Sequence, residues 1–370
     1  MKVAVITRHA ITNYGSLLQA LATQIVLERL GYESEIIDYI RDDESYQKHE
    51  ITLLKRKPSW YNNPLKRIIY LSLRQPESIF AGRRFEKERR KLLKMSKRYS
   101  TFEALVQNPP DADIYLTGSD QVWGPVENGT YDPVYCLSFV PKGSKKISYA
   151  ASFGHTDMND ELQEYFKHNL SGYDAITVRE NSALKLLSDL GLKAKQVIDP
   201  TLLLTSDEWN KYIIPPKRGK YILVYQLHNN PRLDLYAEKV SKDKQLPIVR
   251  VSALFHQIIR KGKLVVCPKM GEFLGYIRYA ECMITDSFHG TAFALNFNIP
   301  FVEVLPNNNT GTRNISILML TGLSNRILQD ENDISLASEE IDFAPVNAIL
   351  KRERLKSIDV LKGMIEQLEG

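Results

Sequence analysis

The chain has 370 residues, which is too long for one ordinary hydrophobic core and predicts two domains. Its composition, 43% hydrophobic and 25% charged, is typical of a globular protein, and no stretch approaches the roughly 18 to 20 apolar residues of a membrane-spanning helix. No secretory signal is visible, and Cys136, Cys267 and Cys282 lack the paired spacing of a zinc site. We expect a cytoplasmic protein with three reduced, buried thiols and no metal.

Apolar runs alternate with helical periodicity along the chain, a pattern that indicates an α/β architecture. The first half opens with a strand over residues 2–7, a helix over 16–31 that stops at Gly31, and a strand over 34–39. These three elements form a βαβ unit. The other elements predicted in this half are strands at 113–120, 145–154 and 173–180 and a helix at 181–191, and the segment 195–204 closes the half.

A stretch with two adjacent prolines, residues 205–220, is the predicted hinge between domains 1–204 and 221–345. The second half continues with a helix at 271–280 and strands at 221–227, 247–253, 263–268, 280–286 and 300–305, and it ends in an amphipathic helix at 346–370. The pattern therefore predicts two Rossmann-like domains facing a cleft at the carboxyl ends of their strands, where such folds bind ligands.

A basic insert at about 42–100 interrupts the first domain. Residues 55–98 contain fifteen Lys and Arg but only three Glu, a net charge of +12, whereas the rest of the chain carries −7. Its first part also holds aromatic and aliphatic residues, so we expect residues 55–98 to settle on an anionic membrane surface. Nucleic acid is the rival partner for a basic stripe, but the rest of the chain is acidic and no nucleic-acid motif occurs, so we expect none.

Several polar residues follow predicted strands of the first domain. Asn13, Gly15 and Ser16 precede the first helix, where free N–H groups and a hydroxyl would bind an anion or a sugar hydroxyl. The alternative is plain helix capping. Asp120 lies just past a strand, where a carboxylate would accept a proton from a bound hydroxyl, or would merely cap a turn.

Two basic residues, Arg179 and His289, also follow predicted strands further along the chain. Arg179 at a strand end suits a bidentate carboxylate or phosphate partner, and the alternative is an ion pair within the chain. His289 stands where a strand turns into a helix, between Ser287 and Gly290, so its ring would reach a ligand beside helix N–H groups. These residues indicate a site for an anion and hydroxyls.

An ordered series of segments resembles the polysaccharide pyruvyl transferase family. The segments are NYGSLLQALA, GSDQVW, SYAASFG, AITVRENSALKLL, VIDPTLLL, EFLGYIRYAECMITDSFHGTAFALNFNIPF and NISILMLTGLSNRIL, running from residue 13 to residue 328. The resemblance implies a GT-B-like fold. It also implies transfer of a pyruvyl group from phosphoenolpyruvate onto two hydroxyls of one sugar, giving a cyclic ketal and free phosphate without another cofactor.

The resemblance also implies roles for individual residues. It assigns donor binding to Arg179, and donor binding or proton delivery to His289, beside Ser287 and Gly290. Some relatives carry an arginine near that turn, whereas this chain has Ser287, so we expect Arg313 or Arg278 to replace the missing cation. We expect Asp120 to deprotonate the acceptor.

The expected partners are phosphoenolpyruvate and a saccharide acceptor, which we expect to be linked to a lipid at the inner face of the plasma membrane. Two alternatives stay open. One is a glycosyltransferase of the same fold that uses a nucleotide sugar, and the other is a non-catalytic relative that binds a sugar or an anion.

Overall fold

The computed structural model describes residues 1–306 and 311–369, and the chain divides into two compact units. The first unit comprises Met1–Pro200 with Ile358–Gly370, and the second comprises Thr201–Ser357. The predicted hinge, residues 205–220, lies inside the second unit and includes the short helix α9 (Ser206–Asn210). Bending of this segment and the expected cleft remain predictions.

The first unit is built on a parallel sheet. Its strand order is β2 (Glu33–Ile36), β1 (Lys2–Ile6), β3 (Ile114–Thr117) and β4 (Lys145–Ser148). Isolated parallel bridges from Ile147 and Ala151 continue this order to β5 (Thr177–Val178), which pairs with β6 (Lys195–Gln196). Helix α1 (Tyr14–Arg29) follows β1, and Gly31 takes a positive φ of 91° just after it, as the sequence predicted.

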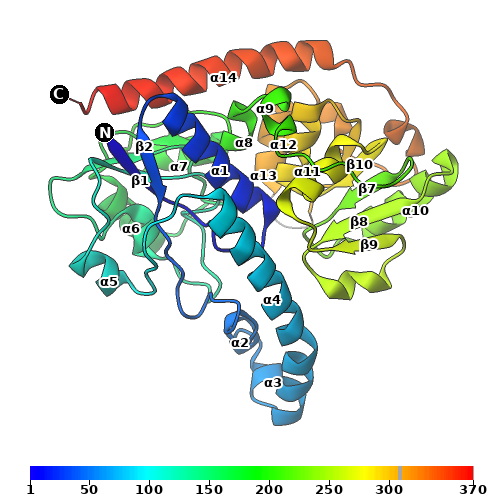
Figure 1. Cartoon of the computed structure of the whole chain (residues 1–370), viewed down its shortest axis with the longest axis horizontal. Coiled ribbons are helices and arrows are strands. Elements are labelled where there is room, and N and C mark those ends of the chain that lie inside the picture. Colours follow the sequence, from blue (N-terminus) through cyan, green and yellow to red (C-terminus); the bar gives the residue numbers. More distant parts are fainter. Residues whose placement is uncertain (307–310, 370) are drawn as a thin grey trace. The chain divides into compact units, whose positions relative to one another are not determined.

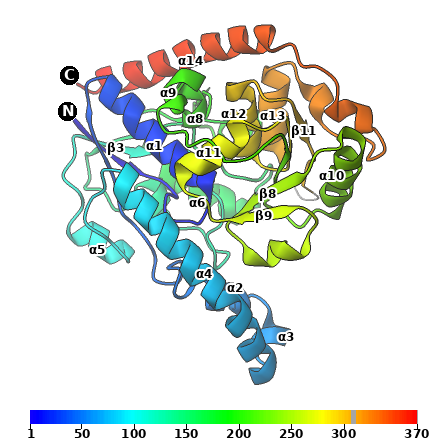
Figure 2. The ribbon, with the colours of Figure 1, turned by 45° about the vertical axis from the view of Figure 1, so that its right-hand side comes forward.

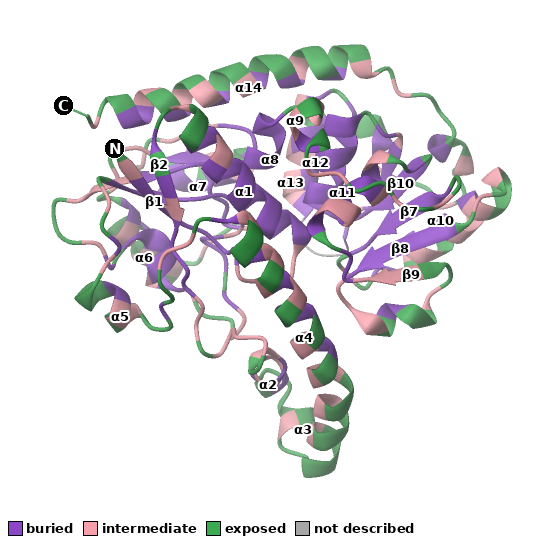
Figure 3. Cartoon of the chain, in the orientation of Figure 1, coloured by how far each residue is buried: buried purple, intermediate pink, exposed green. Residues whose placement is uncertain are grey.

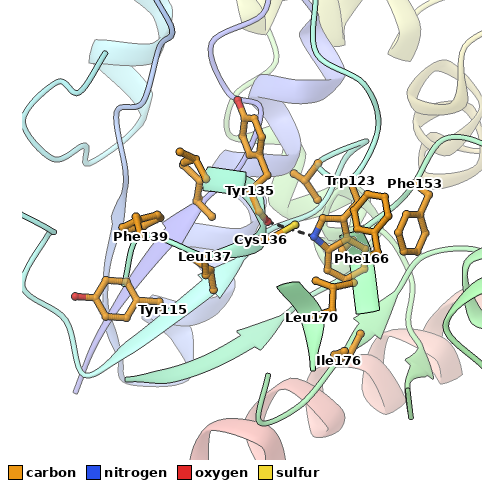
Figure 4. Close-up of a cluster of buried hydrophobic side chains, with 14 of the residues drawn as sticks. Tyr115, Trp123, Tyr135, Cys136, Leu137, Phe139, Phe153, Phe166, Leu170 and Ile176 are labelled. Carbon is orange, nitrogen blue, oxygen red and sulfur yellow. Dashed lines mark hydrogen bonds between the residues drawn. The ribbon is translucent and has the colours of Figure 1, made fainter. Parts of the chain in front are cut away.

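Helices of the first unit enclose a large aromatic core. They are α5 (Phe102–Gln107), α6 (Asp160–Leu170) and α7 (Asn181–Asp189). Figure 4 shows Trp123 packed among Phe153 and Phe166, with its indole N–H donated to the Tyr135 carbonyl at 3.2 Å. This core supports the strand ends β3 and β4, which carry the polar residues considered below.

The segment 195–204, for which the sequence predicted no element type, contains both a strand and a helix. Only Lys195–Gln196 form a strand, and Pro200 begins the short helix α8 (Pro200–Leu203). Proline has no N–H for a strand ladder but fits the first turn of a helix, so the apolar residues 202–204 are buried from a helical turn instead.

The basic insert forms an arm of helices α2 (His49–Lys55), α3 (Pro58–Tyr61) and α4 (Pro64–Leu92). Figures 1 and 2 both show α3 at the end of this arm that is remote from the sheet β2-β1-β3-β4. The other end of α4 is anchored on the first unit, where the rings of Phe85 and Tyr14 lie 4.9 Å apart and Arg89 donates to the Ala10 carbonyl at 2.9 Å.

The second unit has a five-stranded parallel sheet. Its strand order is β11 (Phe301–Glu303), β10 (Cys282–Thr285), β7 (Ile222–Tyr225), β8 (Ile248–Ser252) and β9 (Lys263–Val266). Its helices are α10 (Pro231–Lys244), α11 (Met270–Arg278), α12 (Phe288–Phe297) and α13 (Thr312–Leu320). Figure 3 shows the strands of this sheet as largely buried, which explains why they appear in the sequence as continuous apolar runs.

The last helix, α14 (Phe343–Glu366), begins three residues before the predicted start at 346, and Gly370 lies outside the described residues. Short 3₁₀ helices complete the chain: η1 (Pro133–Cys136), η2 (Phe255–Ile259), η4 (Ser324–Arg326) and η5 (Ile334–Ala337). Among the described residues, no helix is long and apolar enough to cross a membrane. All three cysteines are buried free thiols, as predicted.

Candidate functional site

Each sheet has one point where the strand order reverses, and this is where α/β sheets bind ligands. In the first unit, β1 leads to β2 on one side while β3 leads to β4 on the other, so the reversal lies between β1 and β3. In the second unit the reversal lies between β7 and β10. Asp120 follows β3 and His289 follows β10, so each stands at the reversal point of its own sheet.

Asp120 is held in an unusual backbone conformation. Its φ is 78°, in the left-handed region that few residues other than glycine, asparagine and aspartate adopt. The Ser16 hydroxyl, from the first turn of α1, donates to Asp120 Oδ2, and the Gln121 N–H donates to Oδ1 at 2.9 Å. These contacts aim a nearly buried carboxylate at the strand end. The bond from the Gln121 N–H is the turn cap of the alternative interpretation, and the catalytic role of Asp120 stays a prediction.

Arg179 lies among three carboxylates. Its guanidinium donates to Asp199 Oδ2 at 2.6 Å, and it lies 3.7 Å from a Glu180 oxygen and 4.0 Å from an Asp120 oxygen. Burial alone would lower the pKa of Arg179, but the neighbouring charges outweigh it, Asp199 foremost, and raise that pKa. The alternative of an ion pair within the chain is thus realised. A donor anion would have to compete with these carboxylates.

The start of α1 is capped by its own sequence. The side chain of Asn13 accepts the N–H groups of Gly15 at 2.8 Å and of Ser16 at 3.4 Å. Two of the N–H groups that we expected to bind an anion are therefore already bonded, and the capping alternative is correct for Asn13. The predicted contact of Asn13, Gly15 and Ser16 with a ligand stays a prediction, and the Ser16 hydroxyl is directed to Asp120 instead.

Asp286 links the two strands at the reversal point of the second sheet. Its buried carboxylate accepts the N–H groups of Leu227 at 2.7 Å and His228 at 3.0 Å, both just past β7. The His228 ring lies 3.2 Å from the same carboxylate. Asp286 therefore fixes the loop after β7 against the end of β10, three residues before His289.

His289 lies in the first turn of α12 and is 4% exposed. Ser287 caps this helix by accepting the Gly290 N–H at 3.3 Å, and the backbone N–H of Ser287 donates to the Thr285 hydroxyl at 3.0 Å. A Cβ on Gly290 would lie 2.6 Å from that hydroxyl and 2.7 Å from the Met283 side chain, so glycine lets α12 approach the sheet. These contacts position His289, and donor binding by Ser287 and Gly290 stays a prediction.

The two arginines proposed as replacement cations lie in different places. Arg278, on α11, donates to the Phe297 carbonyl at 3.1 Å, at the opposite end of α12 from His289. At about 1.5 Å per residue the two ends of α12 are roughly 13 Å apart, so Arg278 is ruled out as a neighbour of His289. Arg313 is the second residue of α13, next to Asn314, and it is the candidate that remains.

A buried acid, Glu303, joins the elements around His289. It ends β11 and is 0% exposed; Thr291 in α12 donates to one carboxyl oxygen, and Asn314 in α13 donates to the other at 2.7 Å. Burial raises the pKa of Glu303 to about 8, with a further rise from Asp286, while the two hydrogen bonds oppose it. Glu303 thus links the first turn of α12 to the first turn of α13.

This raised pKa predicts a pH-dependent stability. Between the ordinary glutamate value and pH 8 the folded protein keeps a proton that the unfolded chain releases, so stability falls as pH rises, by at most about 1.4 kcal/mol per pH unit. Glu303→Gln, which does not ionise, should flatten this slope and melt higher than wild type above pH 8. Melting curves from pH 5 to 9, with exposed Glu340→Gln as control, test this. Parallel curves for wild type and Glu303→Gln would contradict it.

The structure adds residues that the sequence did not single out: Asp199, Glu303 and Asn314. Asp199 precedes Pro200 in a segment of the family resemblance, and Glu303 ends a predicted strand, so strand-end position was the available signal. Across residues 1–306 and 311–369, no group of three or more His, Cys, Asp and Glu side chains is arranged to hold a metal ion.

Solved structures share the fold of this chain. A putative UDP-N-acetylglucosamine 2-epimerase from Listeria monocytogenes is 12% identical, with a TM-score of 0.52 over 96% of this chain and 90% of its own. The S. aureus MnaA–UDP co-structure is 13% identical, with a TM-score of 0.52 over 91% and 87%. The trehalose-6-phosphate synthase OtsA is 12% identical, with a TM-score of 0.52 over 100% and 99%. These likenesses confirm the predicted α/β, GT-B-like fold class.

No curated protein matches the sequence. The sequence model of the polysaccharide pyruvyl transferase family, in contrast, matches residues 13–309. The matched region runs from the Asn13 cap of α1 through β3 and β10 to the residues after β11, so it includes both Asp120 and His289. The chain therefore belongs to the polysaccharide pyruvyl transferase family.

Proposed function

We propose that this protein transfers the pyruvyl group of phosphoenolpyruvate to two hydroxyls of one sugar, forming a cyclic ketal and releasing phosphate. The observation that carries the proposal is the family match over residues 13–309, which includes Asp120 and His289. The reaction balances without water or an oxidant. One hydroxyl adds to C2 as C3 gains a proton, and the second hydroxyl displaces phosphate, so the two hydroxyl protons end on C3 and on phosphate.

Two sets of residues are proposed to act on the donor, those around His289 and, separately, Arg179. Phosphoenolpyruvate has a carboxylate and a phosphate, so its site needs cations and N–H donors, and C3 needs an acid. His289 is proposed to deliver that proton, held in place by the Ser287 cap and by Gly290. Arg313, in the first turn of α13, is proposed to supply the positive charge that Ser287 lacks.

The acceptor is assigned to the strand end that carries Asp120. Its carboxylate already accepts a hydrogen bond from the Ser16 hydroxyl. A sugar hydroxyl would make the same contact with a general base. Arg179 lies 4.0 Å from Asp120, its most distant carboxylate partner. A donor carboxylate or phosphate is proposed to replace Asp120 beside Arg179, which would leave Asp120 available to the acceptor.

The acceptor is proposed to be a sugar of a bacterial cell-surface polysaccharide or of its lipid-linked precursor, used in the cytoplasm or at the inner face of the plasma membrane. Family membership supports a saccharide acceptor and a pyruvyl donor. Phosphoenolpyruvate serves as co-substrate, and no other cofactor enters the proposed reaction.

The proposal is tested by measuring phosphate released from phosphoenolpyruvate with a panel of saccharides, and by the mass of the saccharide product. The product should gain the elements of pyruvic acid minus one water. Asp120→Asn is the matched variant, because asparagine also adopts a positive φ and keeps the shape of the side chain but is no base. We expect it to slow release by about 10²-fold or more while the protein stays folded. Transfer from a nucleotide sugar to the same panel would refute the proposal.

A further inference from the structure

The first part of helix α4 exposes its apolar side chains, whereas a surface helix normally buries its apolar face. Five large apolar side chains between residues 65 and 80 are 40–72% exposed. Their successive separations of three, one, four and seven residues place them on one face of the helix. This outer face of α4 comprises Leu65, Ile68, Ile69, Leu73 and Phe80, and it continues along the helix with the exposed Arg83, Lys87 and Arg90.

The opposite face of α4 is held by polar contacts. Tyr70 donates to the Glu50 carboxylate at 2.9 Å, Gln75 donates to the Gln47 carbonyl at 2.9 Å, and Ser78 donates to the Tyr46 carbonyl at 3.2 Å. These hydrogen bonds fix the orientation of the helix about its axis, because a rotation would break them. The apolar outer face stays exposed unless something outside this chain covers it.

The charge of the basic segment indicates which kind of partner covers the outer face of α4. Residues 55–98 carry a net +12, and the end of α4 that carries Arg83, Lys87 and Arg90 extends the apolar stripe as a basic one. A second copy of this chain would bring two such surfaces of like charge together, which is unfavourable. An anionic bilayer accepts both parts, since aliphatic side chains enter the acyl boundary while Lys and Arg contact phosphates.

Trp60 on α3 adds an aromatic side chain at the same end of the arm. It is 40% exposed, its ring lies 6.4 Å from the ring of Tyr70 in α4, and Lys66 Nζ lies 5.8 Å from its centre. Tryptophan beside lysine is typical of the level between acyl chains and headgroups. Helix α3, which carries Trp60, and the first turns of α4 form the end of the arm remote from the sheet (Figures 1 and 3).

We propose that the outer face of α4, with Trp60, docks the protein on an anionic lipid bilayer. Leu65, Ile68, Ile69 and Leu73 enter the boundary of the acyl chains. Arg83, Lys87 and Arg90 bind lipid phosphates. This inference does not depend on the identity of the donor substrate.

The test is sedimentation of the full chain with vesicles of phosphatidylcholine, alone or mixed with phosphatidylglycerol. Wild type should bind only the anionic vesicles and should be released by salt. Leu65→Ser/Ile69→Ser/Leu73→Ser and Arg83→Glu/Lys87→Glu should each bind at least about tenfold more weakly, since each basic residue contributes about fivefold. Ile258→Ser/Ile259→Ser changes two apolar residues that are 72% and 87% exposed outside the arm, and it should bind as wild type.

Tryptophan emission gives a second readout. Trp123 and Trp209 are buried, at 1% and 0% exposure, so a blue shift on adding anionic vesicles reports Trp60 and should vanish in Trp60→Phe. Equal binding to neutral vesicles, unchanged binding of the triple serine variant, or no binding at all would overturn the proposal. So would light scattering showing a wild-type dimer that the triple serine variant abolishes, since a second copy would then cover this face.

Discussion

Replacing His289 by alanine is expected to lower the acceptor-dependent release of phosphate from phosphoenolpyruvate by about 10²- to 10⁴-fold, the usual contribution of a general acid. His289 stands at the reversal point of its sheet, in a helix turn fixed by the Ser287 cap, and the loop beside it is held by Asp286. Removing the ring takes away the proposed proton donor for C3 and leaves this framework intact.

The measurement is steady-state phosphate release, together with a melting curve to show that the variant is folded. His289→Gln should be nearly as inactive as His289→Ala, because the amide of glutamine cannot donate a proton as a general acid. His155→Ala, a half-buried histidine of the first unit whose ring bonds the Asp157 carbonyl at 2.8 Å, is the control and should retain activity. Near-normal turnover of His289→Ala would show that another group supplies the proton.

Replacing Arg179 by alanine is expected to destabilise the protein by about 3–5 kcal/mol, because removing one partner of a buried ion pair leaves charges buried and uncompensated. Asp199, Glu180 and Asp120 would then face one another around an empty position, with Asp199 and Glu180 almost completely buried. For a unit of this size the loss corresponds to a fall of roughly 6–20 °C in melting temperature.

A double-mutant cycle separates the pair from its surroundings. Asp199→Ala alone should also destabilise the protein, and Arg179→Ala/Asp199→Ala should lose less than the sum of the two single variants. Arg90→Ala removes an exposed arginine on α4 from Glu86, which keeps its ion pair with Arg98, and should cost at most about 1 kcal/mol. Strict additivity, or a change for Arg179→Ala no larger than for Arg90→Ala, would show that the buried cluster does not act as a unit.

Much of the fold was predictable because the strands of parallel sheets are buried on both faces. Strands β1, β3, β7 and β10 appear as unbroken apolar runs, and helix α12 follows β10 where the sequence indicated. The sequence predicted no element type for 195–204, since an apolar run looks alike in a strand and in a short buried helix.

The residues of the candidate site also fall into those that the sequence predicted and those that it did not. Strand-end position alone indicated Asp120, Arg179 and His289, because the order of strands and helices reveals which residues end at the carboxyl edge of a sheet. The partners of these residues depend on tertiary contacts. The bond between Asn314 and Glu303, and the three carboxylates around Arg179, follow no spacing rule along the chain. The same holds for Arg278, whose contact with the end of α12 removed it as a candidate.

The outward direction of the apolar residues on α4 is a further case. The composition of residues 55–98 indicated a basic, partly apolar segment, but only the contacts of Tyr70, Gln75 and Ser78 show which face is turned inward. A helical pattern gives the relative positions of residues around the axis. It does not say which side a neighbouring element will cover.

The central claim, that phosphoenolpyruvate is the donor, is tested most directly by calorimetric titration of the protein with phosphoenolpyruvate and, separately, with uridine diphosphate. This measurement needs no knowledge of the acceptor. The account predicts saturable binding of phosphoenolpyruvate that weakens at least about tenfold in Arg313→Ala, since a charge-assisted contact contributes about 1.5–3 kcal/mol, and no saturable binding of the nucleotide. Binding of uridine diphosphate with none of phosphoenolpyruvate would contradict it and would identify a nucleotide-dependent transferase instead.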